Sequence, residues 1–420
     1  MRSLLLCSTF LLGIEIYQFR FNFYRLICIS VGTIHSKELF SRSTNSLSRS
    51  TEPCCDKDTL SCYDVEADPE SLLSDENISI NGMELKFSNT IPPHGRAYKT
   101  EQGDEAVISY NKDTGNIFGS LKTNDGKSFA LEKCGNGYIF EEFDLQAFST
   151  EEEAEPEEFA SKNIVRSMSP QTFNDRNEIV TYSVMIYYTP EFAAVTPNIR
   201  DFVDQVVAET NQGYINSQIP IRIKVFCTEE AAIDEKDTSA AVMLAALRNL
   251  KSSYEELRNS ADAATLLTND LGACGRGSTG TYATGTSVSV SKKSCALGYY
   301  SFGHELGHNL GATHNPESSS NPWFSYGHGH LIQPTGQKKW SGYRTILAYY
   351  SEGHNERVNY YSNPNVNFPG TGTPTGVADL SDNARVITDN RHAFAAVGDE
   401  SGVCNDGSAP TTTVAPTLEG

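Results

Sequence analysis

Three histidines and a glutamate near position 310 have the types and spacing of a catalytic metal site. His304 and His308 are four residues apart, so on a helix both imidazoles can reach one ion. Glu305 lies one residue further round, where it suits a general base acting on a metal-bound water. Gly311 can take the positive φ that ends a helix and returns His314 as a third ligand. Three neutral ligands leave the fourth position of one zinc ion for water.

The alternative is that these are ordinary histidines of a helix. The chain has 9 histidines among 420 residues. A chance match of all five specified residues at these offsets has a probability on the order of 1 in 10⁵. We therefore interpret this stretch as a zinc site. A second metal at His328-Gly329-His330 is less well supported, because two histidines in a glycine-rich loop are more often solvated.

The elements that must position this site alternate between strands and helices, which is typical of an α/β layer. We expect strands over 179–188, 221–226 and 263–267, and helices over 197–216 and 239–257. A glycine-rich loop over 272–280 precedes the alternating residues 286–291. We interpret the latter as an exposed edge strand that could pair with an extended peptide near Val288. Ser381 or Asp382 should cap a last helix.

The front of the chain has a different pattern. Residues 35–75 are rich in Ser, Thr and acidic residues and are expected to be poorly ordered. Residues 83–143 alternate like short strands broken by turns, which indicates a small β-rich domain. The acidic linker 150–166, which includes the run Glu151–Glu158, marks the boundary to a second domain. The Pro/Thr-rich tail 405–420 is expected to be disordered.

The N-terminus and the composition bear on location and partners. Within residues 1–34, the apolar run Leu4–Ile14 behind Arg2 has the pattern of a secretory signal peptide, and an uncleaved anchor is the alternative. No later segment is apolar enough to span a membrane. Ten cysteines and a sequon at Asn77 fit an extracellular protein, which we expect to be a monomer. The formal net charge of -20 argues against nucleic acid as a partner.

The stretch His304–His314 resembles the defining helix of the metzincin zinc peptidases. The order Cys274-Gly275, Cys295-Ala296, Phe302-Gly303 before that helix is similar to reprolysin-like members. Three further stretches resemble the bacterial peptidyl-Asp metallopeptidases and their animal relatives: Tyr360–Pro364, Pro374–Gly376 and Asp382–Val386. The resemblance implies an α/β (α+β) catalytic domain over 167–404 with a twisted mixed sheet and a zinc helix. It also implies that residues 35–166 form a β-rich propeptide.

The resemblance assigns two residues beyond the zinc helix. Metzincins have a turn with Met beneath the metal, and Arg344–Tyr349 is similar to that turn with Leu347 in the Met position. Leu has a similar volume and should preserve the packing. Tyr349 matches a tyrosine that astacin-like and serralysin-like relatives place near zinc, where it could bind the metal or hydrogen-bond the tetrahedral intermediate. A packed core tyrosine is the alternative.

The cysteines permit two bridges in the back half. The reprolysin-like order implies a bridge between Cys274 and Cys295, which leaves Cys227 to pair with Cys404. In the front half, Cys134-Gly135 resembles the Cys-Gly of metzincin cysteine switches, in which a thiolate occupies the fourth zinc position. A structural or paired cysteine is the alternative for Cys134.

The sequence therefore predicts a secreted zinc endopeptidase made as a zymogen, with protein or peptide substrates. It gives no prediction for calcium. The peptidyl-Asp resemblance implies a preference for an acidic residue after the cut. Arg344, Arg357 and Arg385 are the candidate cations for such a pocket. The alternative functions are a binding protein that keeps the fold without catalysis and a zinc hydrolase of non-peptide substrates.

Overall fold

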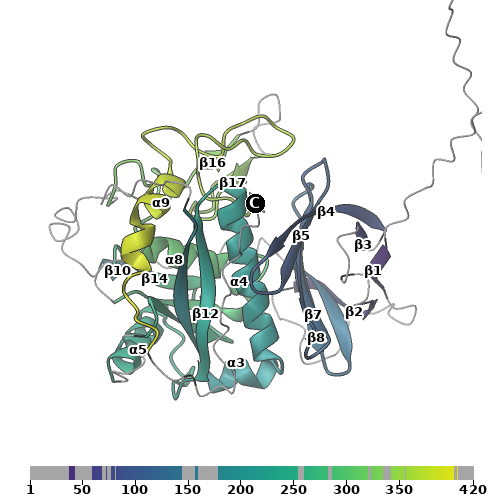
Figure 1. The fold of residues 1–420 in the computed structure, drawn as a ribbon, viewed down its shortest axis with the longest axis horizontal. Helices are drawn as coiled ribbons and strands as arrows, with labels where there is room; N and C mark the ends of the chain where they lie inside the picture. Colours follow the sequence, from purple (N-terminus) through teal and green to yellow (C-terminus); the bar gives the residue numbers. More distant parts are fainter. Residues whose placement is uncertain are drawn as a thin grey trace, which may run out of the picture.

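The computed structural model describes residues 37–42, 59–68, 72, 77–80, 82–143, 157–158, 178–253, 260–281, 286–319, 323–333, 342–354, 356–401 and 404. It consists of a barrel (37–143) beside a larger α/β body (178–401), with helix α4 between the barrel and the sheet (Figure 1). No helix among the described residues combines the length and hydropathy needed to cross a membrane. The expected signal peptide 1–34 and the tail 405–420 lie outside the described residues.

The barrel is closed and mainly antiparallel, with the strand order β1-β2-β9-β8-β7-β6-β5-β4-β3. Its strands are β1 Lys37–Arg42, β2 Thr59–Ala67, β3 Ile78–Ile80, β4 Met83–Ile91, β5 Gly95–Lys99, β6 Glu105–Asn111, β7 Asn116–Lys122, β8 Ser128–Cys134 and β9 Gly137–Phe143. The expected strands over 83–143 are confirmed. The expectation that 35–75 is poorly ordered was wrong for β1 and β2, because Leu39 and Val65 enter the barrel core despite the polar composition around them.

The α/β body contains a six-stranded sheet with the order β10-β14-β15-β13-β11-β12. These strands are β10 Glu157–Glu158, β11 Val180–Tyr188, β12 Ile221–Glu230, β13 Ala263–Thr268, β14 Gly275–Thr279 and β15 Val288–Lys292. Strand β14 is antiparallel to β15, whereas the other neighbours run parallel. A small second sheet comprises β16 Leu331–Ile332, β17 Tyr343–Arg344 and β18 Glu356–Arg357.

Helices cover both faces of the sheet, which confirms a mixed α/β architecture. They are α3 Pro190–Val195, α4 Ile199–Asn216, α5 Ala240–Ser253, α7 Lys293–Ala296, α8 Ser301–Asn309 and α9 Asn383–Phe394. The apolar positions of α4, among them Phe202 and Val206, are buried in one core with α8, and Leu244 of α5 is buried in a second core. As expected, Asp382 caps α9 by accepting the backbone N–H of Arg385.

The position of the edge strand differs from the prediction. The expected edge strand near Val288 is β15, which lies inside the sheet between β13 and β14. The expected loop 272–280 instead contains β14. In the sheet, β14 lies between β15 and the outermost strand, β10. Backbone alternation is the same in edge and internal strands, so the local pattern did not distinguish the two.

The barrel contacts the polar side of α4. Asp201 accepts a hydrogen bond from Asn116 of the barrel at 2.7 Å, and Gln205 donates to the carbonyl oxygen of Val107 at 2.8 Å. Gly95 approaches closely, since a Cβ there would lie 2.7 Å from Cβ of Ala208. The contact therefore alternates hydrogen bonds with close backbone packing.

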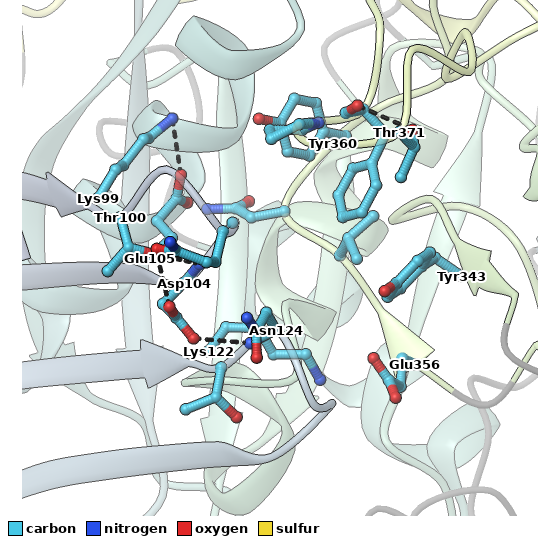
Figure 2. Close-up of a pocket in the computed structure, with 18 of the residues that line it drawn as sticks. Lys99, Thr100, Asp104, Glu105, Lys122, Asn124, Tyr343, Glu356, Tyr360 and Thr371 are labelled. Carbon is cyan, nitrogen blue, oxygen red and sulfur yellow. Dashed lines mark hydrogen bonds and ion pairs between the residues drawn. The ribbon is translucent and has the colours of Figure 1, made fainter. Parts of the chain in front are cut away.

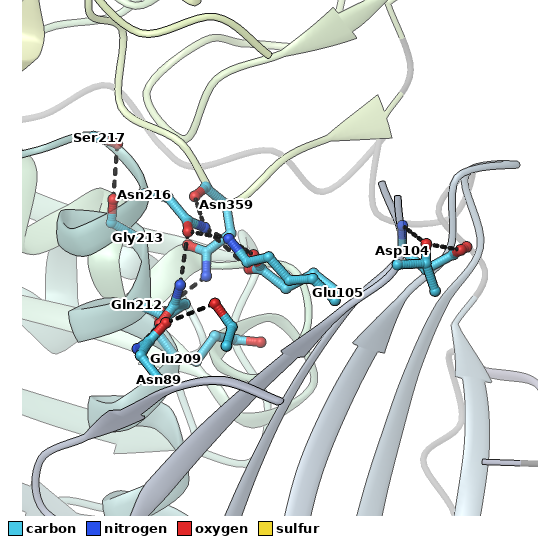
Figure 3. Close-up of polar contacts among 12 residues, drawn as sticks. Asn89, Asp104, Glu105, Glu209, Gln212, Gly213, Asn216, Ser217 and Asn359 are labelled. Atoms are coloured by element: carbon cyan, nitrogen blue, oxygen red, sulfur yellow. Dashed lines mark hydrogen bonds and ion pairs between the residues drawn. The ribbon is translucent and has the colours of Figure 1, made fainter. Parts of the chain in front are cut away.

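A polar network continues this contact toward the end of α4 (Figure 3). Asn216 donates to Glu105 of the barrel at 3.0 Å and accepts from Lys99 at 2.7 Å. Gln212 donates to Asn216 and accepts from Asn89. Each donor in this network meets an acceptor on the other body or on α4, which adds specificity to the apolar contact of Ile91, Ala97 and Val107 with Ala208.

A buried ion pair joins the barrel to the segment before α8. Nζ of Lys293 in α7 lies 2.9 Å from the Glu132 carboxylate of β8, and the side chains are 4% and 8% exposed. Phe143 at the end of β9 packs against Gly298, where a Cβ would lie 2.5 Å from the ring. The barrel thus contacts the connection that leads into α8.

A cavity of about 340 Å³ lies between the barrel and the α/β body (Figure 2). Its lining includes Lys122 and Asp104 from the barrel and Tyr343, Glu356 and Tyr360 from the α/β body. Burial lowers the pKa of Lys122 to about 8 and raises the pKa of Glu356. None of the histidines of the predicted metal site lines this cavity, so it belongs to the junction of the two bodies.

Candidate metal centre

Helix α8 carries the first two predicted ligands. It begins after Tyr300, whose φ is 66°, and its last turn leads to Gly311 with φ of 95°, as the sequence predicted. Glycines lower its intrinsic helix propensity, so packing must stabilise it. Leu306 is buried in the core, and Asn309 donates to the carbonyl oxygen of Ser278 in β14 at 2.7 Å. These contacts fix α8 against the edge of the sheet.

The structure brings the three predicted ligands together. The Nε2 atoms of His304, His308 and His314 lie 2.9 to 3.2 Å from one another, and all three rings are buried. Nδ1 of His304 lies 2.7 Å from the carbonyl oxygen of Ile346, and Nδ1 of His308 lies 2.9 Å from that of Ala312. A carbonyl oxygen only accepts, so we assign the proton of both rings to Nδ1.

The position of the ring protons bears on whether these residues fit a metal ion. With their protons on Nδ1, neutral His304 and His308 direct Nε2 lone pairs at each other across 3.0 Å. Two acceptors at that distance repel unless a cation lies between them. Carbonyl oxygens that hold the outer ring nitrogens are the usual support of metal-binding histidines. The donor set therefore fits a divalent metal that prefers nitrogen ligands, such as zinc.

Two glycines of β14 make room for Glu305 beside the triad. A Cβ at Gly275 would lie 2.6 Å from Oε1 of Glu305, and a Cβ at Gly277 would lie 2.8 Å from its backbone oxygen. The same Cβ at Gly277 would come within 3.4 Å of His308. This role of Gly277 was not predicted from the sequence. The alternation Gly-Arg-Gly in front of the helix is the signal that could have indicated close approach of a backbone.

The chain after α8 holds the third histidine in place. Nδ1 of His328 lies 2.8 Å from the carbonyl oxygen of His314, so His328 supports the ligand loop. Asn315 accepts the backbone N–H of Tyr349 at 2.9 Å, and the Tyr349 ring centroid lies 3.7 Å from that of His314. The expectation that His328 is solvated was wrong, because this hydrogen bond holds its ring in the buried interior. Asn315 was not assigned from the sequence. Among the described residues, only the triad gathers three metal-binding side chains closely enough for one ion.

Leu347 lies where the turn resemblance placed it. It is fully buried, and a Cβ at Gly307 of α8 would lie 2.9 Å from its Cδ2 atom. The preceding residue, Ile346, supplies the carbonyl oxygen that binds Nδ1 of His304. This turn therefore supports α8 from below, and Leu347 fills the space that the helix glycine leaves.

Both disulfides expected in the back half are present. Cys274–Cys295 joins the start of β14 to α7, and Cys227–Cys404 joins β12 to the end of the described chain. The expected cysteine switch was wrong. Cys134 is itself disulfide-bonded and buried beside Cys62 and Ile139 in the barrel, so it has no thiolate to offer a metal.

The three candidate arginines have different surroundings. Arg344 and Arg357 are fully buried and both contact Tyr299, with guanidinium groups 5.4 and 4.4 Å from its ring centroid. Arg385 on α9 is half exposed, lies 4.1 Å from the ring centroid of Tyr326 and pairs with two carboxylates. Only Arg385 of these three is accessible to a bound molecule in the described structure.

The predicted glycosylation site lies at the start of β3. The amide oxygen of Asn77 accepts the backbone N–H of Phe87 at 3.2 Å, and Ser79 of the sequon is buried. Modification of Asn77 stays a prediction.

Comparisons with known proteins agree with this geometry. The model of Metallo-peptidase family M12, of the reprolysin type, matches residues 180–362. A peptidyl-Asp metalloendopeptidase of Stenotrophomonas maltophilia (strain R551-3) is 31% identical over 313 residues, which cover 70% of this chain and 71% of the relative. A protein of the same name from Xanthomonas campestris pv. campestris is 29% identical over 332 residues, covering 75% and 76%. Another from Pseudomonas fragi is 30% identical over 193 residues, covering 45% and 99%.

Proposed function

Because this chain belongs to the M12 family of metallopeptidases and is a metalloendopeptidase, we propose that it is a zinc enzyme of the metzincin type, secreted as a zymogen. The observation that carries the proposal is the convergence of three Nε2 atoms within 3.2 Å, two of them on rings whose protons are held by carbonyl oxygens. His304, His308 and His314 would hold the ion. When bound, zinc supplies Lewis-acid polarisation of the scissile carbonyl and makes water more acidic.

Glu305 would act as the general base. It follows His304 on α8 and is fully buried beside β14, so its carboxylate is held in a site from which bulk water is excluded. It would take a proton from the attacking water and deliver it to the leaving amine. Tyr349, half-buried against His314, is the candidate to donate a hydrogen bond to the developing oxyanion.

We also propose the domain boundaries that the sequence pattern and the family resemblance imply. Residues 1–34 would be the signal peptide, 35–166 the propeptide with its acidic linker 150–166, 167–404 the catalytic domain and 405–420 the tail. The hydrogen bonds that Asp201, Gln205 and Asn216 of α4 make with the barrel support a removable propeptide, since these side chains can be hydrated after release. N-terminal sequencing of the secreted, active form tests the boundary. We expect a start near residue 167.

A preference for an acidic residue after the cut would follow the relatives, which are named peptidyl-Asp metalloendopeptidases. Arg385 is the candidate cation, because its side chain is half exposed whereas Arg344 and Arg357 are fully buried. The two carboxylates that pair with Arg385 weaken its attraction for a third.

The test is proteolysis of a proteome-derived peptide library by the released enzyme. We expect cleavage that stops with a zinc chelator and returns with zinc, with Asp or Glu enriched directly after the cut. Arg385→Gln should reduce this enrichment while cleavage of neutral peptides persists. Enrichment of Leu or Phe at that position would contradict the acidic preference, and absence of metal-dependent cleavage would contradict the catalytic assignment.

A further inference from the structure

The cavity between the barrel and the α/β body has two walls of different chemistry (Figure 2). The barrel wall carries charged side chains, among them Asp104 and Lys122, whereas the opposite wall carries Tyr343 and Glu356. Its volume of about 340 Å³ lies within the range of pockets that bind small ligands, which is about 300 to 1,000 Å³. The cavity is therefore large enough for a small molecule or one long side chain.

Negative charge exceeds positive charge in the lining of this cavity. Four carboxylates and two ammonium groups line it. Glu105 pairs with Lys99 at 2.8 Å, and Asp104 and Asp125 each accept a hydrogen bond from a neighbouring barrel residue. The fourth carboxylate, that of Glu356, has a buried Oε2 atom without a hydrogen-bond partner among the described residues. A buried anion is costly unless it is paired, so this oxygen favours a cationic donor.

The position of Glu356 is fixed by the barrel, although no barrel side chain completes its hydrogen bonding. Glu356 lies directly against Gly126 of the β7–β8 turn, where a Cβ would overlap its carboxylate. Lys122 attracts Glu356, but its ammonium donates to the carbonyl oxygen of Gly126 at 3.1 Å and to the Ser128 hydroxyl at 3.0 Å. Asn359 also lines the cavity, is 4% exposed, and has an Oδ1 atom without a partner in the described part of the chain. The α/β body thus supplies two acceptor atoms that lack donors.

Aromatic rings complete the wall of the α/β body. Phe368 packs against Tyr343 with ring centroids 4.6 Å apart and meets Tyr360 edge to face at 5.6 Å, and all three rings line the cavity. Aromatic faces attract cations. A guanidinium group combines stacking on a ring with a forked pair of donors for a carboxylate, and it is more weakly hydrated than an ammonium. The wall therefore suits a guanidinium group.

We propose that this junction cavity is a binding site for a guanidinium group, which pairs with Glu356 and stacks on the aromatic rings. A small molecule and an arginine side chain both present this cation. A ligand held in the cavity contacts the barrel and the α/β body together, so its binding stabilises the association of the two bodies. Such binding is independent of peptide cleavage, so it can be tested whether or not the proposed peptidase activity holds.

Isothermal titration calorimetry of the full chain tests this site. Glu305→Ala is present throughout, so that no peptide probe is cleaved. The probes are butylguanidinium and butylurea, a neutral analogue of the same shape. We expect butylguanidinium to bind about tenfold more tightly than butylurea, because a charge-assisted hydrogen bond is stronger than a neutral one. Equal binding of the two probes, or no binding of either, would overturn the proposal and leave the cavity to water.

Two matched substitutions locate the site. Glu356→Gln keeps the size of the side chain and leaves no buried charge unpaired, so the variant should fold. It should bind butylguanidinium about tenfold more weakly, because the charged acceptor is lost. Glu352→Gln makes the same charge change at an exposed residue that does not line the cavity, and its affinity should stay within about twofold of the unaltered chain. Equal affinities of the two variants would overturn the role of Glu356.

A further variant and a peptide probe define the contacts and the source of the ligand. Phe368→Leu keeps an apolar side chain but removes the ring, so it should weaken binding about two- to fivefold. An unchanged affinity would overturn the stacking. The peptide acetyl-Gly-Arg-Gly-amide separates the two sources. If it binds with the same dependence on Glu356, an arginine side chain is an occupant of the cavity, whereas binding of butylguanidinium alone assigns the site to a small molecule.

Discussion

The α8–β14 side and the α4–barrel side of the α/β body are both polar and buried, but their polar atoms are arranged in opposite ways. Where the barrel meets α4 and α7, donors face acceptors: Asn216 of α4 donates to Glu105, and Lys293 of α7 pairs with Glu132. In the triad, atoms of the same kind face each other, since His304 and His308 direct Nε2 lone pairs together across 3.0 Å. The first arrangement pairs opposite hydrogen-bonding groups, whereas the second places like acceptors together and so favours a bound cation.

The barrel contact therefore holds the two bodies together, whereas the histidine triad can bind a metal ion. A buried polar contact whose groups are already paired stabilises the association of the two bodies, because separating them would break its hydrogen bonds. A cluster of like acceptors instead suits a metal ion, which all of their lone pairs can bind at once. The two sides should therefore respond differently to substitution, and four experiments test that expectation.

The largest effect should come from the triad. His308→Ala removes one of three ligands, so we expect loss of bound zinc and of all measurable peptide cleavage. Glu305→Gln should keep one zinc per chain and reduce kcat by about 10²- to 10⁴-fold, the usual contribution of a positioned base. Elemental analysis together with a fluorogenic peptide assay measures both. Retained turnover in the Glu305 variant would refute the assignment of the base.

The next effect concerns the barrel side. Glu132→Ala leaves the Lys293 ammonium buried without this carboxylate, which should lower the free energy of unfolding of the full chain by about 3–5 kcal/mol. Zinc binding should persist, because this ion pair joins the barrel to α7 and includes none of the proposed zinc ligands. Urea unfolding measures the loss.

The matched control replaces both partners of that pair. Glu132→Leu with Lys293→Met should be less destabilised than Glu132→Ala, since no buried charge is left unpaired. If Glu132→Ala instead released zinc from the folded chain, the barrel contact and the metal site would depend on each other, which contradicts the expectation.

A smaller, pH-dependent effect is expected at Glu209 of α4. Burial raises its pKa from 4.5 to about 8, although backbone N–H of Gly298 and the Ser120 hydroxyl favour the charged form. Between those values the folded chain retains a proton that the unfolded chain has lost. Stability should therefore fall as the pH rises from 4.5 to 8, by up to about 1.4 kcal/mol per unit. Above pH 8 this contribution levels off.

Thermal unfolding at several pH values, with Glu209→Gln as the reference, isolates this contribution. The Gln side chain cannot titrate, so the variant should lose less stability across pH 5 to 8 than the unaltered chain. Other titrating groups contribute equally to both proteins and cancel. Parallel pH profiles for the two proteins would contradict the raised pKa of Glu209.

The smallest effect should come from Leu347. Leu347→Met conserves volume beneath α8 and should change the free energy of unfolding by less than about 1.5 kcal/mol, with kcat/KM nearly unchanged. Leu347→Ala is the contrasting variant, because it opens a cavity and should cost about 2–5 kcal/mol. A large gain in activity with Met would show that Leu347 compromises the metal site.

Several features could be predicted from the sequence because they depend on neighbouring residues. The spacing of His304, His308 and His314 around Gly311 determines the helix, its end and the gathering of the ligands. The cap of α9 likewise follows from Asp382 and the helical pattern after it. The resemblance supplied the Cys274–Cys295 bridge, and Cys227–Cys404 remained for the second.

Tertiary structure alone decided the features that depend on distant partners. The pairing of Cys134, the polar contacts of α4 and the place of β1 and β2 in the barrel involve residues far apart in the chain. Strand alternation gives which side chains share a face, but it does not show which backbone edge meets another strand. For that reason β15 was taken for the edge, and the close approach of β14 to Glu305 and to the linker became visible only in the folded protein.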